Sequence, residues 1–265
     1  MEIDNLSMKE IKAVFFDVDK TIYDPINNFI PESTLTALKK LRSNGYKIGI
    51  STSRPMLTAR AVPGLMDIPW DGMIIAGGQQ IYSQGQLVLE NTFTQAQRDQ
   101  IFQIADRHHI PVYTVAEEVF FTEMNDLVRR FIKMFGIPYR TVKPYRGQAS
   151  YLICLIHEED QDILPLFKDV EGICPIAAGP INHDIFKKGV LKSDCIMKLM
   201  KYWGYDPHAF MAFGDTLSDA PMLEAARIGV AMGNADIQTR KKADIVCGDY
   251  REDGILLLLQ SLHMI

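Results

Sequence analysis

The sequence predicts an α/β fold, a doubly wound, Rossmann-like parallel sheet into which an α+β module is inserted. The first observation is the apolar run Ala13–Phe16, which stops abruptly at Asp17 and is typical of a strand buried on both faces. The second is that strand-like and helix-like segments alternate up to residue 76, which indicates parallel strands joined by right-handed crossovers. The third is that this alternation stops and returns from Gly189, so the sheet domain encloses an insertion.

The first part of the sheet is divided into elements by proline and glycine. Pro31 begins a segment with leucines on one face, and Asn44 and Gly45 follow it. Proline at the start and glycine just past the end are typical of a helix. Residues 46–50 and residues 73–76 are therefore predicted to be the next two strands.

The central part of the chain mixes strands and helices in a different order. A hairpin is expected over residues 81–89, with its turn at residues 84–86. The other elements expected there are helices over 96–108, 125–135 and 161–169 and strands over 112–115, 119–122, 151–156 and 174–178. A mixed set of about 100 residues is a normal domain size. We therefore assign residues 83–185 to the inserted module.

The last part of the chain returns to the alternating order. The expected elements are helices over 190–203 and around 223–226 and strands over 209–213, 228–232 and 244–246. Residues 1–82 and 186–265 are therefore predicted to form one sheet domain.

Composition excludes several classes of protein. The 265 residues carry a net charge of −5 and their basic residues are scattered, so binding to nucleic acid is not expected. The acidic N-terminal segment lacks the apolar core of a signal peptide, and the longest aliphatic run, residues 255–259, is too short to cross a membrane. Four cysteines without short-range pairing fit a reducing compartment, so we expect a cytoplasmic protein. The oligomeric state stays open.

Two acids follow the first predicted strand. Asp17 and Asp19 leave the backbone on the same side, because a strand has a period of two residues. They lie where the strand ends, which is where open α/β sheets bind ligands. Two adjacent anions repel each other, so a cation is their simplest stabilising partner, and oxygen ligands favour a hard ion such as Mg²⁺. The alternative is that both acids only form the turn, because Asp is common in turns.

Other predicted strand ends and helix starts carry groups that suit the same site. They are Asp215 and Asp219, the hydroxyls of Ser51, Thr52 and Ser53, and the lysines at 187, 188 and 192, which are expected to open a helix. Strand ends of a doubly wound sheet converge on one crevice. Acids with a metal, a hydroxyl and an ammonium suit phosphoryl transfer. One carboxylate attacks, cations neutralise the phosphoryl oxygens, and a second carboxyl moves the proton.

In order and spacing, four motifs resemble those of the haloacid-dehalogenase-like (HAD) superfamily. They are Asp17-Val18-Asp19-Lys20-Thr21, Thr52 with Arg54, Lys192, and Gly214-Asp215 through Asp219. The tail is similar to that of the Cof-type phosphatases, in Gly229 to Ala235, Ala243-Asp244 and Glu252-Asp253-Gly254. That subgroup carries a large α/β cap between its second and third motifs. The resemblance covers the whole core and implies that residues 83–185 are a cap that selects the substrate.

The resemblance also implies a role for each motif residue. Asp17 would be the nucleophile that forms an aspartyl-phosphate, and Asp19 would be the general acid and base. Thr52 and Lys192 would hold the phosphoryl oxygens. The ligands of Mg²⁺ would be Asp17, the backbone carbonyl of Asp19, and Asp215, with Asp219 supporting the site.

Several assignments have alternatives. Thr52 could instead cap a helix, and Asn234 could do the same for the next one. Arg54 could orient the substrate or pair with a structural acid. Lys188 and Lys192 lie one helical turn apart, so either could reach the site, and the spacing to the preceding glycine favours Lys192.

Three positions depart from the pattern of the subgroup. Lys20 stands where Gly is usual and adds a positive charge beside the nucleophile, which either aids phosphate binding or crowds it. Ser218 replaces the usual Asn before Asp219, and Gly77 replaces the usual Asn at the entrance to the cap. None of the three removes a group that makes or breaks a bond.

The function that the resemblance implies is a Mg²⁺-dependent phosphomonoester hydrolase acting on small phosphorylated metabolites, with sugar phosphates favoured. The cap would exclude water and choose the leaving group. Two alternatives stay open: a phosphomutase on the same capped core, and a catalytically weak binding or regulatory protein. The presence of both Asp17 and Asp19 favours an enzyme. The expected partner is a small phosphorylated substrate, with no nucleic acid and no membrane.

Overall fold

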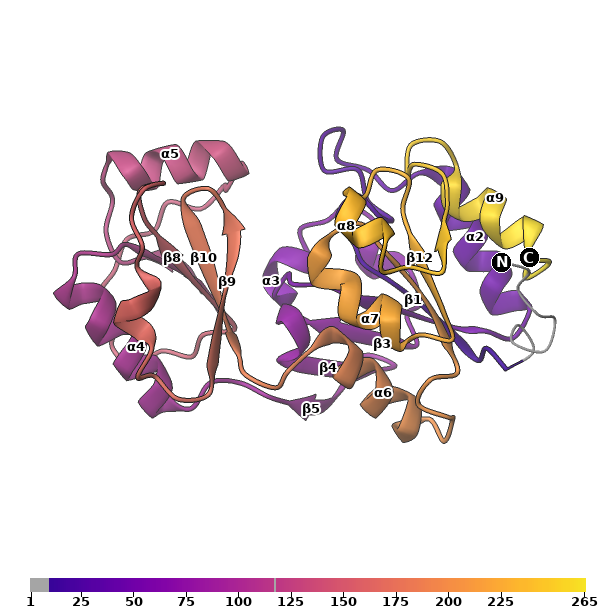
Figure 1. Ribbon diagram of the computed structural model, residues 1–265, viewed down its shortest axis with the longest axis horizontal. Helices are drawn as coiled ribbons and strands as arrows, with labels where there is room; N and C mark the ends of the chain where they lie inside the picture. The colour runs from indigo at the N-terminus through magenta and orange to yellow at the C-terminus, as the bar shows by residue number, and fades with distance from the viewer. Residues whose placement is uncertain (1–9, 117) are drawn as a thin grey trace. The chain divides into compact units, whose positions relative to one another are not determined.

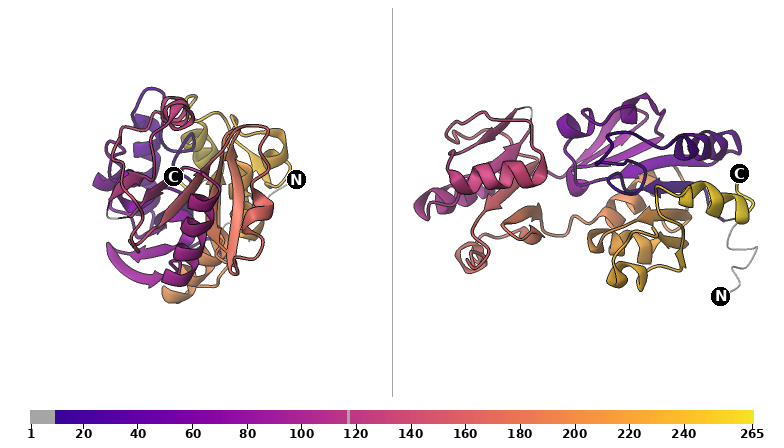
Figure 2. Two further views of the ribbon diagram at one scale, coloured as in Figure 1. Left: turned by 90° about the vertical axis from the view of Figure 1, so that its left-hand side faces the viewer. Right: turned by 90° about the horizontal axis from the view of Figure 1, so that it is seen from above.

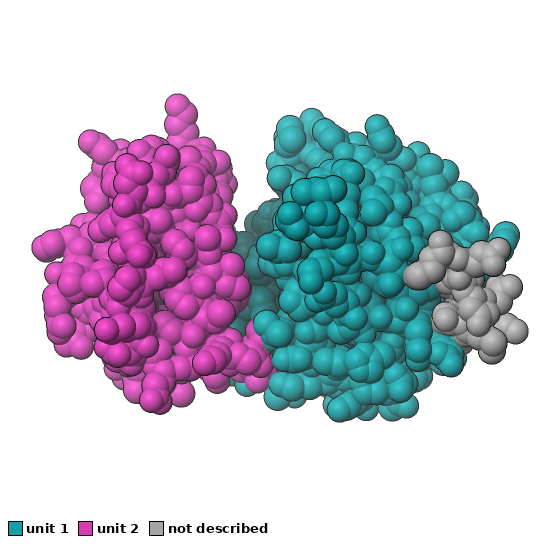
Figure 3. All heavy atoms as spheres, in the orientation of Figure 1, with its two compact units in different colours: residues 1–90, 191–265 teal, residues 91–190 magenta. Residues whose placement is uncertain are grey.

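The computed structural model describes residues 10–116 and 118–265, which divide into two compact units. Unit 1 comprises Met1–Glu90 and Leu191–Ile265, and unit 2 comprises Asn91–Val190 (Figure 3). Each unit is a β-sheet with helices packed against it (Figure 1). The predicted fold class, an α/β core with an inserted α+β module, is confirmed.

Unit 1 is built on an eight-stranded sheet with the strand order β13-β12-β11-β1-β2-β3-β4-β5. Its strands are β1 (Ala13–Phe16), β2 (Lys47–Ser51), β3 (Gly72–Ile75), β4 (Gln80–Ser83), β5 (Gln86–Glu90), β11 (Phe210–Gly214), β12 (Ile228–Ala231) and β13 (Ile245–Val246). The strands from β13 to β3 are parallel, and β4 and β5 extend the sheet in antiparallel order. Strand β1 pairs with β11 on one side and β2 on the other, and all its residues are buried, which explains its unbroken apolar sequence.

The helices of unit 1 make the sheet doubly wound. They are α2 (Glu32–Ser43), α3 (Met56–Ala59), α6 (Lys192–Tyr202), α7 (Ala220–Ala225), α8 (Ile237–Arg240) and α9 (Gly254–Ser261). Helix α2 starts after Pro31 and ends before Asn44, as predicted. The crossovers from β1 to β2 and from β11 to β12 run in opposite directions along the sheet. Right-handed connections therefore put α2 and α7 on opposite faces (Figure 2).

Unit 2 is a five-stranded antiparallel sheet with helices. Its strands are β6 (Val112–Val115), β7 (Val119–Phe121), β8 (Leu152–Ile156), β9 (Ile173–Gly179) and β10 (Asn182–Lys187), in the order β7-β6-β8-β10-β9. Helix α4 (Gln95–Arg107) begins with a capping box between Thr94 and Gln97. Helix α5 (Asp126–Phe135) begins at the Asn125 cap and ends at Gly136, whose φ is 61°. Ile101, Phe102 and Ala105 of α4 join the hydrophobic core of this unit.

Two expectations for unit 2 are wrong. The helix predicted over 161–169 is only a 3₁₀ turn, Leu164–Phe167, because Pro165 lies at its start and disfavours the α conformation of the residue before it. The expectation that Lys187 and Lys188 open a helix also fails. Lys187 ends β10, which pairs with β8 and β9, and Lys188 follows that strand.

The hairpin predicted over residues 81–89 is present as β4 and β5, and it belongs to the sheet of unit 1, because β4 pairs with β3. The structure therefore divides after Glu90 and after Val190, whereas the predicted limits lie at 82 and 185. The assignment of unit 2 as a substrate-selecting cap stays a prediction.

Two further observations concern membrane-spanning helices and the cysteines. Within the described ranges, every helix falls short of the length and apolarity that a membrane span needs. All four cysteines are free. Cys154 and Cys195 are buried, Cys247 is half-buried and Cys174 is exposed.

Candidate active site

Asp17 is fixed at the carboxyl end of β1. Its backbone N–H donates to the carbonyl of Phe213 at 2.9 Å, which continues the parallel ladder with β11 by one residue. Its side chain is buried, and Oδ1 accepts a hydrogen bond from Lys192 Nζ at 2.7 Å. Burial raises the pKa of Asp17 well above its usual value, Asp219 raises it further, and Lys192 acts in the opposite direction. The ionised form of this acid therefore depends on nearby positive charge.

Lys192 is the first residue of α6 and is buried. Its Nζ donates to Asp17 Oδ1 at 2.7 Å and to Asp219 Oδ1 at 2.6 Å. Burial alone would lower the pKa of Lys192, but the two carboxylates outweigh it and raise the pKa above its ordinary value. The ammonium is therefore held between two acids. Lys188 is exposed and has no ion pair with any residue that the structure describes.

Asp219 is positioned by the turn that follows β11. Its Oδ2 accepts hydrogen bonds from the backbone N–H groups of Asp215 and Thr216 and from Thr216 Oγ1, each at 3.1 Å. A Cβ on Gly214 would lie 2.5 Å from the Cβ of Asp219, so only glycine lets the acid fold back at this point. Both Asp219 oxygens are thus occupied, and the residue holds Lys192. Sequence reasoning missed Thr216, although the T-x-x-D pattern of a capping box could have identified it.

Asp215 supplies an unsatisfied oxygen to a cluster of three carboxylates. Asp17, Asp215 and Asp219 each place one carboxylate oxygen within 4.8 Å of the others. Asp215 Oδ1 is buried and has no hydrogen-bond partner among the described residues. Burial, together with Asp219, raises the pKa of Asp215 to about 7, although Lys20 and Lys192 oppose the shift. The unsatisfied oxygen of Asp215, close to the carboxylate of Asp17, fits a hard divalent cation such as Mg²⁺.

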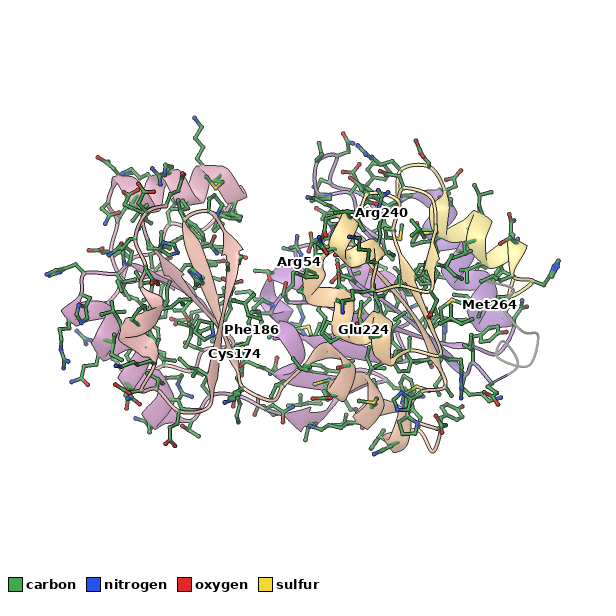
Figure 4. All side chains as sticks on the ribbon, viewed as in Figure 1. Arg54, Cys174, Phe186, Glu224, Arg240 and Met264 are labelled. Carbon is green, nitrogen blue, oxygen red and sulfur yellow. The ribbon has the colours of Figure 1, made fainter. Side chains whose placement is uncertain are left out.

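Arg54 binds the predicted general acid and base. It lies between β2 and α3 (Figure 4), and its Nε and Nη2 donate to the two carboxylate oxygens of Asp19 at 2.7 and 2.6 Å. Burial alone would lower the pKa of Arg54, but the bonds to Asp19 raise it. The carboxylate of Asp19 is thus engaged by Arg54, which leaves its backbone carbonyl for the predicted metal contact.

Thr52 follows β2 directly and is buried. Its Oγ1 accepts a hydrogen bond from the backbone N–H of Arg54 at 3.1 Å. It is not the N-cap of the next helix, because that position in α3 belongs to Pro55. A hydroxyl that accepts one bond can still donate its own proton, so Thr52 can serve as a donor to an anion.

Asn234 and Ser218 lie at the margin of the site. Asn234 Nδ2 donates to the backbone carbonyl of Lys20 at 2.9 Å, and Asp236 rather than Asn234 caps α8. Ser218 is exposed and bonds to Thr216 Oγ1 at 2.8 Å. Asn234 therefore fixes the segment after Asp19, and Ser218 borders the turn that carries Asp219.

Comparison with known proteins places this chain in a family. The model of the haloacid dehalogenase-like hydrolases matches residues 14–259. The pyridoxal phosphate phosphatase YbhA of Escherichia coli (strain K12) is 27% identical over 278 residues, which cover 96% of this chain and 99% of YbhA.

Two solved structures share the fold. BT1666 from Bacteroides thetaiotaomicron, described among phosphatases of the HAD superfamily, has a TM-score of 0.87 at 24% identity and covers 100% of this chain and 99% of its own. The HAD subclass IIB sugar phosphatase BT4131 has a TM-score of 0.81 at 24% identity, covering 96% of this chain and 100% of its own. The predicted enzyme class, a HAD-like phosphatase, is confirmed, and the chain belongs to the haloacid dehalogenase-like hydrolase family.

Proposed function

We propose that this chain is a Mg²⁺-dependent phosphomonoester hydrolase that acts through an aspartyl-phosphate on small phosphorylated metabolites, with sugar phosphates as the leading class. The observation that carries the proposal is the buried Asp17 at the end of β1, held 2.7 Å from the ammonium of Lys192. A carboxylate beside a buried ammonium and the unsatisfied oxygen of Asp215 suits attack on a phosphoryl group, whose charge the cations neutralise.

The first half-reaction transfers the phosphoryl group to Asp17. A carboxylate oxygen of Asp17 forms a bond to phosphorus while the bond from phosphorus to the leaving oxygen breaks. Lys192 and the hydroxyl of Thr52 donate to the non-bridging oxygens. When bound to Asp17, Asp215 and the backbone carbonyl of Asp19, Mg²⁺ supplies positive charge that keeps Asp17 ionised and offsets the phosphoryl charge.

Asp19 moves the protons in both half-reactions. Each of its oxygens accepts one hydrogen bond from Arg54, which leaves a second lone pair on each oxygen for the proton it transfers. Protonated Asp19 then gives its proton to the leaving oxygen. In the second half-reaction the carboxylate of Asp19 takes a proton from water, and the water oxygen bonds to phosphorus. The bond from phosphorus to Asp17 breaks, which releases inorganic phosphate and restores the nucleophile.

The substrate class rests on the relatives and on the order of the chain. One relative is named for pyridoxal phosphate and one structural neighbour is named as a sugar phosphatase, so both names point to small phosphate esters. Unit 2 lies in the chain between Thr52 and Lys192, where the Cof-type subgroup has its cap, and we propose that it selects the leaving group. The four free cysteines support our proposal of a reducing, cytoplasmic setting.

The test is the release of inorganic phosphate from p-nitrophenyl phosphate and from a panel of phosphorylated metabolites. We expect turnover that requires Mg²⁺, stops with a chelator, and is lost in Asp17→Asn. Absence of turnover across the panel would support the weak-binding alternative. Transfer to a sugar instead of water, with dependence on a bisphosphate activator, would support the phosphomutase.

A further inference from the structure

The positively charged side chains of this site differ in whether they are already bonded to a carboxylate. Lys192 is bonded to two carboxylates, and Arg54 is bonded to both oxygens of Asp19. Lys20 is exposed, and within residues 10–116 and 118–265 its side chain has no ion pair and no hydrogen bond. Its ammonium is therefore free to meet an incoming anion.

Lys20 is nevertheless electrostatically linked to the carboxylate cluster. It directly follows Asp19 in the chain. The positive charge of Lys20 also interacts electrostatically with the carboxylate of Asp215. Asp215 also carries the unsatisfied oxygen that we propose for the cation. The ammonium of Lys20 thus acts on the proposed cation position without being bonded to it.

The backbone of Lys20 is held in a conformation that suits glycine. Its φ is 58°, in the left-handed region where a side chain causes strain. Its N–H donates to the carbonyl of Tyr23 at 2.8 Å, and its own carbonyl accepts from Asn234 Nδ2 at 2.9 Å. The segment of Asn234 is held in turn by Arg240 (Figure 4), whose Nε donates to the carbonyl of Ala235 at 2.9 Å. A strained backbone that a long-range hydrogen bond maintains next to an acid points to a functional role for the lysine side chain.

The formal charges of the site show what Lys20 changes. Asp17, Asp19, Asp215 and Asp219 are opposed by Lys192 and Arg54, which leaves an excess of negative charge that one divalent cation would balance. Lys20 makes the cation-loaded site positive before a phosphomonoester dianion arrives. The same charge repels the divalent cation. A lysine at this position therefore favours the anion and disfavours the metal, relative to a glycine.

We propose that Lys20 is an anion-binding residue of this site, which donates to the phosphoryl group and at the same time weakens the binding of Mg²⁺. The proposal rests on the proposed function, because it requires the cation and the phosphoryl group to share the site. It also resolves the choice left open by the sequence, in which Lys20 either aids phosphate or crowds it.

The test compares three variants with the wild type by calorimetry in low salt. Lys20→Met removes the charge but keeps the length, Lys20→Arg keeps the charge, and Lys39→Met removes an exposed lysine of α2 as a control for net charge. We measure Mg²⁺ binding in phosphate-free buffer and then orthophosphate binding to the Mg²⁺-loaded protein.

We expect opposite shifts in Lys20→Met. Mg²⁺ should bind about twofold to fivefold more tightly, the effect of one exposed like charge. Orthophosphate should bind roughly tenfold more weakly, the effect of one lost charge-assisted hydrogen bond. Both shifts should shrink as salt is added. Lys20→Arg and Lys39→Met should match the wild type in both affinities.

Two outcomes would overturn the proposal for Lys20 alone. The first is that the wild type binds both ligands and Lys20→Met binds each of them with the affinity of the wild type. The second is a Lys20→Met protein in which both affinities fall together, since that indicates a structural role. Lys20→Gly checks this point, because it should reproduce both shifts of Lys20→Met and melt at a higher temperature through relief of the strain. A wild type that binds neither Mg²⁺ nor orthophosphate would instead overturn the proposed function, and this inference with it.

Discussion

Replacing Lys192 with methionine should strongly destabilise unit 1. Methionine is similar in length but cannot donate, so Asp17 and Asp219 would lose the ammonium that lies 2.7 and 2.6 Å from their oxygens. Both acids are buried, and Asp219 is wholly inaccessible to solvent. Removing one partner from a buried ion pair costs about 3–5 kcal/mol, because the other charge stays buried without compensation. That loss is a large part of the roughly 5–15 kcal/mol by which ordinary domains are stable.

The assay is urea unfolding of the metal-free protein, followed by circular dichroism at pH 8 and pH 5. The loss should be smaller at pH 5, because the raised pKa of Asp17 lets the orphaned acid take up a proton in the folded state. A second substitution, Asp219→Asn, should recover stability in the Lys192→Met background without recovering activity. Lys188→Met is the matched control and should change stability by no more than about 0.5 kcal/mol. Equal losses for the two lysines, or none for Lys192→Met, would refute the reasoning.

Three further predictions follow from individual contacts. Asp215→Asn should stabilise the metal-free protein at pH 8. In the wild type the folded pKa of Asp215 is about 7, so the folded state binds more protons than the unfolded state below that pH, and stability is lost as pH rises through 7. Thermal melts from pH 5 to 8 in which wild type and variant stay parallel would contradict this. Gly214→Ala places a Cβ 2.5 Å from that of Asp219, so overpacking should cost about 1–3 kcal/mol and weaken Mg²⁺ binding, and unchanged melting and calorimetry would count against it. Asp19→Asn should keep a burst of phenol from an aryl phosphate, but its rate of phosphorylation should fall far more with a sugar phosphate, because a sugar alkoxide needs protonation to leave. Rapid-quench rates that fall equally for both esters would exclude Asp19 as the acid.

The central sheet was predictable because strands buried on both faces are unbroken runs of apolar residues. Strand β1 is covered on both faces, so its four residues are all apolar and stop at the acid. Strand β10 has no such apolar run, because it begins with Asn182, His183 and Asp184, residue types that are not typical of a strand. Its pairing with β8 and β9 supplies what its own sequence does not show.

The candidate site was predictable where strand ends determine it, and less so where distant segments meet. The position of Asp17 beside Lys192 follows from the convergence of strand ends with the start of α6. The bond from Asn234 to the carbonyl of Lys20 joins residues 214 positions apart, and no local pattern in the sequence indicates it. The pairing of Arg54 with Asp19 is of the same kind. The two residues are 35 positions apart, and no local pattern in the sequence determines which acid an arginine meets.

The most direct test of the central claim is the site of a covalent phosphate adduct. The protein is mixed with Mg²⁺ and an aryl phosphate, quenched in acid during turnover, digested and mapped by mass spectrometry, with Asp17→Asn and Asp19→Asn treated in parallel. The account predicts one phosphoryl group on the peptide at Asp17, a larger amount of it in Asp19→Asn because hydrolysis of the adduct lacks its base, and none in Asp17→Asn. An adduct that survives Asp17→Asn and disappears in Asp19→Asn would contradict the account by reversing the two roles.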